Sequence, residues 1–278
     1  RPPLRRRDEL LTPMGLLLAL DVGNTNTVLG FFEGDVLVKT ARLTTVRERT
    51  ADEHALFLRA VIEGKGRRVD EVDDVIVSSV VPPQDFPIRA ACRDLFGIDP
   101  LFVAPGVKTG MKILYDHPAE VGADRIVNAV AAVVAHGAPC IVVDFGTATT
   151  FDVVTASGDY LGGVICPGPG ISADALFSRA ARLSRVDVHR PERVVGKNTA
   201  QSIQSGLFWG VVAQAEGLVA RIRAELGEPR MKVVATGGLA PLFAAASPDL
   251  AVVDADLTLR GLKILHDRNA DARPPRRA

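Results

Sequence analysis

One strand-and-turn pattern occurs twice in this sequence and most constrains its fold. Residues 16–31 read LLLALDVGNTNTVLGF, and residues 140–154 read CIVVDFGTATTFDVV. In each segment an apolar run ends in an aspartate, Asp21 or Asp144, and a glycine follows two positions later. Small hydroxyl or amide residues and a second strand-like run come next. A chain whose halves share this pattern is expected to form two related lobes that face each other across a cleft.

The composition is that of a globular protein with room for two domains. The chain has 278 residues, of which 47% are hydrophobic and 24% charged. Thirty-three basic residues balance thirty-three acidic ones and 5% are aromatic, so no nucleic-acid partner is indicated. No apolar run approaches the roughly 18–20 residues that span a bilayer. The three cysteines form no C-x-x-C pair, which disfavours zinc and disulfides and favours a reducing cytoplasm.

The hydrophobic pattern predicts a similar order of elements in both halves. The first half is expected to contain a strand pair within 16–31, a strand at 36–42, a helix at 51–64, a strand at 74–79, a helix at 84–96 and a strand at 101–104. The second half is expected to contain helix 120–136, strands 140–144, 149–154 and 159–165, helices 170–183 and 199–226, strand 231–235, helix 239–246, strand 250–253 and helix 256–268. Hairpins followed by alternating helices and strands imply mixed sheets covered by helices.

These elements suggest a division of the chain into two lobes. We expect a disordered arm at 1–15, an N-terminal lobe at 16–118, a C-terminal lobe at 119–268 and a disordered tail at 269–278. Within the arm, Met14 is a candidate natural start.

The first turn, DVGNTNT at 21–27, has the chemistry of a phosphate site. Gly23 permits a tight turn, and the residues after it offer short side-chain donors beside free backbone N–H groups. Asp21 could hold a Mg²⁺–phosphate complex through water. An ordinary hairpin turn is the alternative, because Asp, Asn, Gly and Thr are common turn formers. The second copy of the pattern at Asp144 favours the phosphate site.

Two other segments each allow two interpretations. In EVGADRIVN, Asp124 and Arg125 stand at the start of a predicted helix. Asp124 could simply stabilise the helix N-terminus, or it could be a general base beside an arginine that binds an anionic group. The turn Thr236-Gly237-Gly238 could admit an adenosine ring or ribose, or could be a plain strand-to-helix turn. The five histidines form no ligand-spaced pair, which disfavours a histidine metal site.

Six segments together resemble the type III pantothenate kinases of the actin/Hsp70/sugar-kinase superfamily. They are DVGNTNT, YDHPAEVGADRIVN, DFGTATT, GGVICPGPGIS, GKNTAQSIQSG and ATGGLA, in the family's order and within about residues 16–265. The resemblance implies an α/β fold of two tandem actin-like (ribonuclease H-like) lobes, with mixed sheets, helices on both faces and an ATP cleft between the lobes. It also implies ATP-dependent phosphorylation of pantothenate to 4′-phosphopantothenate, the first committed step towards coenzyme A.

The resemblance implies roles for individual residues. Asp124 would be the general base facing the substrate's primary hydroxyl, Asp21 would hold Mg²⁺ through water, and Asp144 would bind a monovalent cation, K⁺ or NH₄⁺. The implied ATP contacts are Asp21, Val22, Gly23, Asn24, Thr25, Asn26, Thr27, Val28 and Thr147. The implied substrate contacts are Tyr115, Gly122, Ala123, Asp124, Arg125 and Thr199. The family is typically dimeric, which implies a homodimer with the substrate pocket near the subunit interface.

Two other functions are compatible with the same fold. One is another small-molecule kinase of the superfamily, such as a sugar kinase. The other is a non-catalytic ATP-binding regulator. The presence of Asp21, Asp124 and Asp144 favours an enzyme, and a chain without net charge or an evident DNA-binding helix disfavours a regulator that touches DNA.

Overall fold

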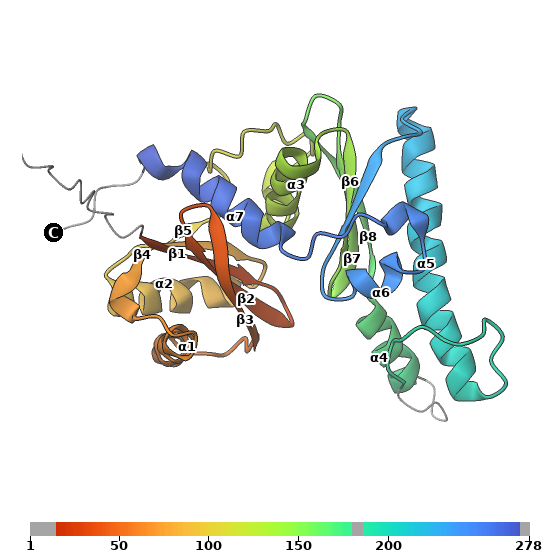
Figure 1. Cartoon of the computed structure of the whole chain (residues 1–278), viewed down its shortest axis with the longest axis horizontal. Helices are drawn as coiled ribbons and strands as arrows, with labels where there is room; N and C mark the ends of the chain where they lie inside the picture. Colours follow the sequence, from red (N-terminus) through yellow and green to blue (C-terminus); the bar gives the residue numbers. More distant parts are fainter. Residues whose placement is uncertain (1–14, 180–185, 273–278) are drawn as a thin grey trace, which may run out of the picture.

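The molecule contains two mixed β-sheets with two helices between them, α3 (Ala123–His136) and α7 (Leu257–Arg268), as Figure 1 shows. The computed structural model describes residues 15–179 and 186–272. The first sheet has the order β3-β2-β1-β4-β5, with β1 (Leu16–Val22), β2 (Asn26–Glu33), β3 (Val36–Thr44), β4 (Val72–Ser79) and β5 (Leu101–Phe102). The second has the order β8-β7-β6-β9, with β6 (Cys140–Phe145), β7 (Ala148–Val154), β8 (Tyr160–Pro167) and β9 (Lys232–Thr236).

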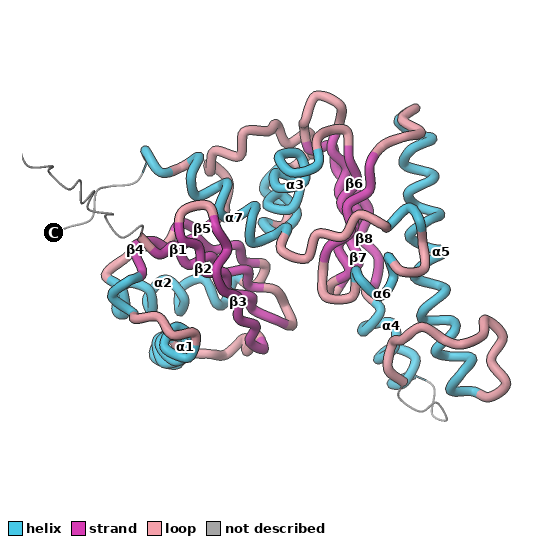
Figure 2. Tube along the Cα trace, viewed as in Figure 1, coloured by secondary structure: helices cyan, strands magenta, loops and turns pink. Residues whose placement is uncertain are grey.

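Both sheets follow one plan, which the repeated sequence pattern predicted. β1 pairs antiparallel with β2 and parallel with β4, and β6 pairs antiparallel with β7 and parallel with β9. The first sheet packs on α1 (Ala51–Gly64) and α2 (Pro82–Phe96). The second carries α4 (Pro169–Arg179), α5 (Thr199–Leu226) and α6 (Ala240–Ala244) on its outer side (Figure 2). The predicted mixed sheets with helices on both faces are therefore confirmed.

The apolar run of β1 is continuous because both of its faces are covered. Successive side chains of a strand point to opposite faces. Leu16, Leu18 and Leu20 accordingly pack towards α1 and α2, while Leu17 and Ala19 pack towards α3 and α7. The first sheet thus contributes one face to each of two hydrophobic clusters.

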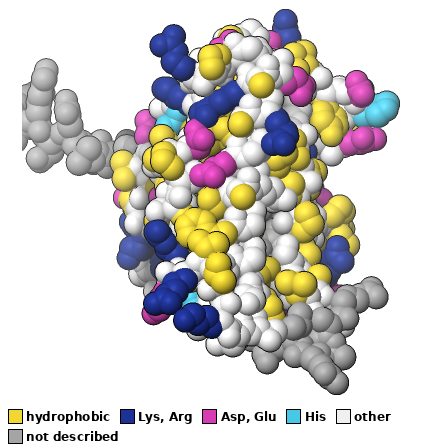
Figure 3. All heavy atoms as spheres, turned by 90° about the vertical axis from the view of Figure 1, so that its right-hand side faces the viewer, with side chains coloured by type: hydrophobic (Ala, Val, Ile, Leu, Met, Phe, Trp, Pro, Cys, Tyr) yellow, Lys and Arg dark blue, Asp and Glu magenta, His cyan; other side chains and the backbone are white. Residues whose placement is uncertain are grey.

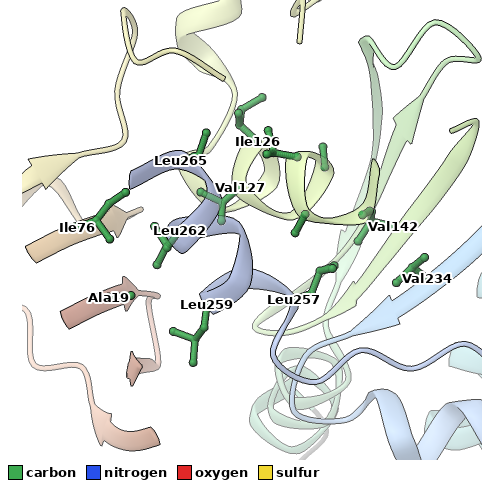
Figure 4. Packing of buried hydrophobic residues seen from close by; sticks show 14 of the residues in the cluster. Ala19, Ile76, Ile126, Val127, Val142, Val234, Leu257, Leu259, Leu262 and Leu265 are labelled. Atoms are coloured by element: carbon green, nitrogen blue, oxygen red, sulfur yellow. The ribbon is translucent and has the colours of Figure 1, made fainter. Parts of the chain in front are cut away.

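The cluster between the sheets joins the two halves of the molecule. It contains Ile76 from the first sheet, Val142 and Val234 from the second, and residues of α3 and α7 (Figure 4). Although α7 follows the second sheet in the chain, it packs against β1 and β4 of the first. A Cβ at Gly261 of α7 would overlap the Val127 carbonyl of α3, so the two helices touch closely there. The proposed lobe boundary at 118–119 stays a prediction.

The observed elements differ from the predicted ones at several ends. No strand forms at 250–253, so that prediction is wrong; an isolated bridge joins Val253 to Ala235, and the 3₁₀ turn Pro248–Leu250 comes just before. Helix α2 begins earlier than expected, at Pro82, because proline is favoured in the first helical turn. Four 3₁₀ turns lie at Val69–Glu71, Pro118–Glu120, Pro248–Leu250 and Ala270–Ala272.

The two chain ends bear on the predicted arm and tail. Residues 1–14 of the arm, residues 273–278 of the tail, and the end of predicted helix 170–183 lie outside the described residues. Asn269, which we placed in the tail, is buried and exchanges hydrogen bonds with the backbone of Lys108. Within 15–179 and 186–272, no helix is both long and apolar enough to cross a membrane.

Candidate active site

The two aspartate–glycine turns meet between the sheets. The hydroxyl oxygens of Thr25 and Thr147, which are 122 positions apart in the chain, form a hydrogen bond of 2.8 Å. In the first turn the Gly23 N–H donates to the Asn26 carbonyl at 3.0 Å, and in the second the Gly146 N–H donates to the Ala148 carbonyl, also at 3.0 Å. Each turn is thus closed by its glycine N–H, although the second is one residue shorter, and their hydroxyl groups meet.

Three half-buried carboxyl groups lie beside these turns, and each has a raised pKa. Burial, followed by the charges of Asp124 and Asp144, raises the pKa of Asp21 to about 8. Burial, followed by the charges of Asp124 and Asp152, raises the pKa of Asp144 to about 7. Burial also raises the pKa of Asp124. Like charges act this way only at short range, so these side chains form one acidic cluster that needs positive charge.

A chain of hydrogen bonds holds Asp144 in place. The Thr258 hydroxyl donates to Asn128 Oδ1 at 2.7 Å, and Asn128 Nδ2 donates to Asp144 Oδ2 at 3.1 Å. Because Asn128 Oδ1 accepts from Thr258, the amide nitrogen must face Asp144. On its other side, a Cβ at Gly237 would overlap Asp144 Oδ1, and the Gly237 φ of 90° also favours glycine. The turn Thr236-Gly237-Gly238 therefore lies directly against the acidic cluster.

Asp124 has features of both interpretations that the sequence allowed. It lies in the first turn of α3, which has Gly122 as its N-cap and no side-chain cap, and Asp124 Oδ1 accepts the Arg125 backbone N–H at 2.8 Å. The carboxyl thus helps to satisfy the helix start. Its charge also raises the pKa of Asp21 and of Asp144, which places it within the acidic cluster as well.

Five of the six predicted substrate contacts lie together, and one lies apart. Gly122, Ala123, Asp124 and Arg125 are consecutive at the start of α3, and Tyr115 is near enough to raise the pKa of Arg125. Thr199 is exposed at the start of α5, on the outer side of the second sheet. In Figure 1 this end of α5 lies far below α3. Within one chain, Thr199 does not join the other five.

A cation could bind here only with help from other ligands. Among the residues that the structure describes, no three His, Cys, Asp or Glu side chains are placed to hold a metal ion. Mg²⁺ keeps several waters and is commonly held by one or two carboxylates plus substrate phosphates. The acidic cluster beside two hydroxyl-rich turns fits such a Mg²⁺–phosphate complex, because it supplies carboxylates and leaves the remaining positions to water and phosphate.

Two residues near the cluster were not predicted from the sequence. Arg42 lies in one cross-strand row with Val28 and Asp21, so the three side chains share a face of the first sheet. Its charge lowers the pKa of Asp21, and its Nη1 would be 3.3 Å from a Cβ at Gly238. Asp152 is completely buried and bonds to Arg125. Asp152 could have been noticed in the sequence as a charge inside the apolar run FDVV. Arg42 could be linked to the site only once the strand register was known.

Comparisons with known proteins identify the family. The family model of type III pantothenate kinases matches residues 17–221. A type III pantothenate kinase of Anaeromyxobacter dehalogenans is 55% identical over 254 residues, which cover 91% of this chain and 100% of that protein. This chain belongs to the type III pantothenate kinase family. The resemblance seen in the sequence motifs is thus confirmed.

More distant solved structures support the fold alone. An activator of 2-hydroxyisocaproyl-CoA dehydratase from Clostridium difficile, solved with bound ADPNP, has a TM-score of 0.55 at 13% identity and covers 95% of this chain and 100% of that chain. A ROK hexokinase from Thermus thermophilus has a TM-score of 0.52 at 15% identity and covers 93% of this chain and 100% of that chain. These likenesses confirm the predicted fold class of two tandem actin-like lobes.

Proposed function

We propose that this pantothenate kinase binds ATP between its two turns and transfers the γ-phosphoryl group to the primary hydroxyl of pantothenate. The product would be 4′-phosphopantothenate, and the reaction would be the first step of coenzyme A biosynthesis. The observation that carries the proposal is the meeting of the Thr25 and Thr147 turns beside three half-buried carboxyl groups with raised pKa values. Family membership supports the choice of substrate.

Asp124 is the proposed general base. It lies at the start of α3 next to Arg125, so both side chains can belong to one substrate site. A raised carboxyl pKa lies closer to neutral pH and makes the group a better proton acceptor during the reaction. General base catalysis of this kind contributes about 10²–10⁴-fold in rate.

The acidic cluster is the proposed cation site. In phosphoryl transfer the protein mainly positions the reactants and stabilises charge on the transferred group. This chain has no Walker A lysine. When bound, Mg²⁺ held by Asp21 through water, and K⁺ or NH₄⁺ held by Asp144, would supply the positive charge. Asp21, Val22, Gly23, Asn24, Thr25, Asn26, Thr27, Val28 and Thr147 are the proposed ATP contacts.

A homodimer would bring Thr199 to a substrate pocket. Since Thr199 is exposed on the outer side of its own chain, a second copy would have to supply it. Figure 3 shows apolar side chains across the face that carries α5. The exposed apolar residues of α4, β8 and the segment before α5 are Ile165, Ile171, Leu176, Phe177, Val194 and Val195. Apolar surface of this kind favours subunit association.

Subunit complementation tests the role of Thr199. Asp124→Asn protein and Thr199→Val protein, each with low activity, should regain activity when they are mixed and allowed to exchange subunits. A mixed dimer would contain one site with both groups intact. Mixtures that are no more active than the sum of their parts would contradict a shared site.

The cytoplasm is the proposed location. Cys92, Cys140 and Cys166 are free thiols. Burial raises the pKa of Cys92 to about 12 and that of Cys140 to about 11, so both stay protonated. Unpaired cysteines suit a reducing compartment, and the balanced charge gives no reason to propose a nucleic-acid partner.

An ADP-release assay distinguishes the three candidate functions. We expect turnover with pantothenate that depends on Mg²⁺ and increases with K⁺, and none with glucose. Turnover with glucose but not with pantothenate would indicate a sugar kinase. ATP binding without turnover on either compound would indicate a non-catalytic regulator.

A further inference from the structure

The guanidinium of Arg125 is buried but only partly hydrogen-bonded. Its side chain is 9% exposed, and its Nε donates to Asp152 Oδ1 at 2.6 Å. Its Nη2 is also buried and has no hydrogen-bond partner in the described part of the chain. A buried donor without an acceptor is costly. The arrangement therefore calls for an acceptor that comes from outside the chain.

Asp152 binds this guanidinium through its Nε atom. The carboxyl is 0% exposed and accepts three side-chain donors. Arg125 Nε and the Tyr160 hydroxyl, at 2.6 and 2.8 Å, share Oδ1, and the Thr150 hydroxyl binds Oδ2 at 3.2 Å. Because Asp152 has no exposed surface, it cannot touch a substrate. Its influence on a bound substrate must therefore pass through the position that it gives Arg125.

The neighbouring strand leaves space for Arg125 to reach the sheet edge. Gly163 is the direct partner of Asp152 in the β7–β8 register, and β8 is the edge strand of the second sheet. A Cβ at Gly163 would overlap the Phe151 carbonyl and would also lie 2.8 Å from Arg125 Nη2. The next glycine, Gly162, would meet the Tyr115 ring at 3.6 Å. Two glycines thus border the space shared by Arg125 and Tyr115.

The geometry decides which edge of Arg125 can bind a carboxylate. Arginine binds a carboxylate best through two parallel N–H bonds. Since Asp152 occupies Nε, the remaining pair is Nη1 and Nη2. We propose that Asp152 is a positioning residue that fixes Arg125 so that this free edge selects substrates with a carboxylate over uncharged analogues. This inference rests on the proposed function, in which Arg125 holds the carboxylate of pantothenate.

The test compares pantothenate with pantothenol, the analogue in which a hydroxyl replaces the carboxylate. Wild-type protein should strongly prefer pantothenate. Asp152→Asn should raise the KM for pantothenate by about 10–100-fold, the value of a hydrogen bond to a charged group, and reduce the preference over pantothenol by a similar factor. The KM for ATP and kcat at saturating pantothenate should change less than about twofold, because neither depends on the carboxylate.

Isosteric variants and a surface control make the result decisive even if Asp152→Asn folds poorly. Tyr160→Phe and Thr150→Val each remove one donor to Asp152 and should raise the KM for pantothenate by about 2–10-fold. Asp70→Asn breaks an exposed Arg–Asp pair in the first lobe, between Arg68 and Asp70 at 2.8 Å, and should leave both substrates unaffected.

Each outcome either supports or overturns the inference. An unchanged preference for pantothenate over pantothenol in the folded variants overturns the role of Asp152. Equal changes in the KM for ATP and for pantothenate also overturn it, because they indicate general disorder of the site. If wild-type protein does not phosphorylate pantothenate, the proposed function fails and this inference fails with it.

Discussion

The two aspartate–glycine turns connect equivalent strands but differ in length by one residue and in their surroundings. Each closes with a hydrogen bond from the glycine N–H, and each follows the central strand of its sheet. Asp144 accepts the Asn128 amide, and its pKa is raised to about 7, whereas the pKa of Asp21 is raised to about 8. Carboxylate ligands of metals must be ionised. The turn thus places a carboxyl group, and its neighbours decide how readily that group becomes charged.

This difference suits the two proposed cations. Asp144, which accepts the fixed Asn128 amide, is prepared to hold a single positive charge such as K⁺. Asp21, whose pKa the charges of both Asp124 and Asp144 raise, suits the stronger field of a divalent ion, which would arrive together with the ATP phosphates. We therefore expect the two related turns to hold different cations.

The largest expected effect comes from the residue that acts on both turns. Asp124 lies in neither turn, yet its charge raises the pKa of Asp21 and of Asp144. Asp124→Asn should lower kcat by about two to four orders of magnitude while ATP still binds, which calorimetric titration with an ATP analogue can measure. Near-normal turnover would leave Asp124 with only its role at the start of α3.

The next largest effect distinguishes the two turns by the cation that each is proposed to hold. Asp144→Ala should abolish the activation of the kinase by K⁺, because the proposed ligand is lost. Asp21→Ala should lower the overall rate and raise the Mg²⁺ concentration needed, while the remaining activity still responds to K⁺. Rates measured over a K⁺ titration at fixed Mg²⁺ distinguish the two variants. If Asp144→Ala keeps the wild-type response to K⁺, the assignment of that cation is wrong.

A smaller effect concerns stability and pH without ligands. The folded-state pKa of Asp21, about 8, lies above its ordinary 3.8. Its contribution to stability is therefore fully present below pH 3.8 and is lost as the pH rises through 8. Asp21→Asn should raise Tm at pH 8 by roughly 2–4 °C for each 1 kcal/mol gained, and by less at pH 5.

The same measurement on Asp144→Asn sharpens the comparison. Its gain in Tm should likewise be larger at pH 8 than at pH 5, because burial also raises the pKa of Asp144, to about 7. The difference between each variant and wild type cancels the titration of groups elsewhere. Variants that are less stable than wild type at pH 8 would show that these carboxyl groups are not destabilised by burial.

The repeat made much of this site predictable from the sequence. Two apolar strands that each end in Asp-x-Gly had to place their turns at equivalent ends of equivalent sheets, and Thr25 and Thr147 do meet. Helix α3 was also predicted, although it begins at Ala123 after its N-cap Gly122 and not at residue 120. The contact between the two halves was not predictable, because packing of α7 on the first sheet brings together residues that are distant in the chain.

Side-chain pairing across strands was the other part that the sequence could not supply. The Arg125–Asp152 pair depends on where α3 crosses the second sheet, and the row of Asp21, Val28 and Arg42 depends on the register of three strands. A shift of one residue would turn every side chain of a strand to the other face. Thr199 shows the same limit, because its motif gives no sign that it lies on the outer side.

The smallest expected effect concerns the hydrogen bond between Thr25 and Thr147, which joins the two turns. Thr25→Val and Thr147→Val remove the same hydrogen bond. If the contact is purely structural, both variants should lose the same stability and keep the wild-type KM for ATP. We instead expect both to raise the KM for ATP by about 2–10-fold, the value of one neutral hydrogen bond, with the double variant less than additive. Thr155→Val is the matched control, because Thr155 bonds Ser157 at the same 2.8 Å in the turn between β7 and β8. It should affect Tm but leave the KM for ATP near the wild-type value. An equal rise in that KM for all three variants would mean that the contact between the turns has no special part in binding ATP.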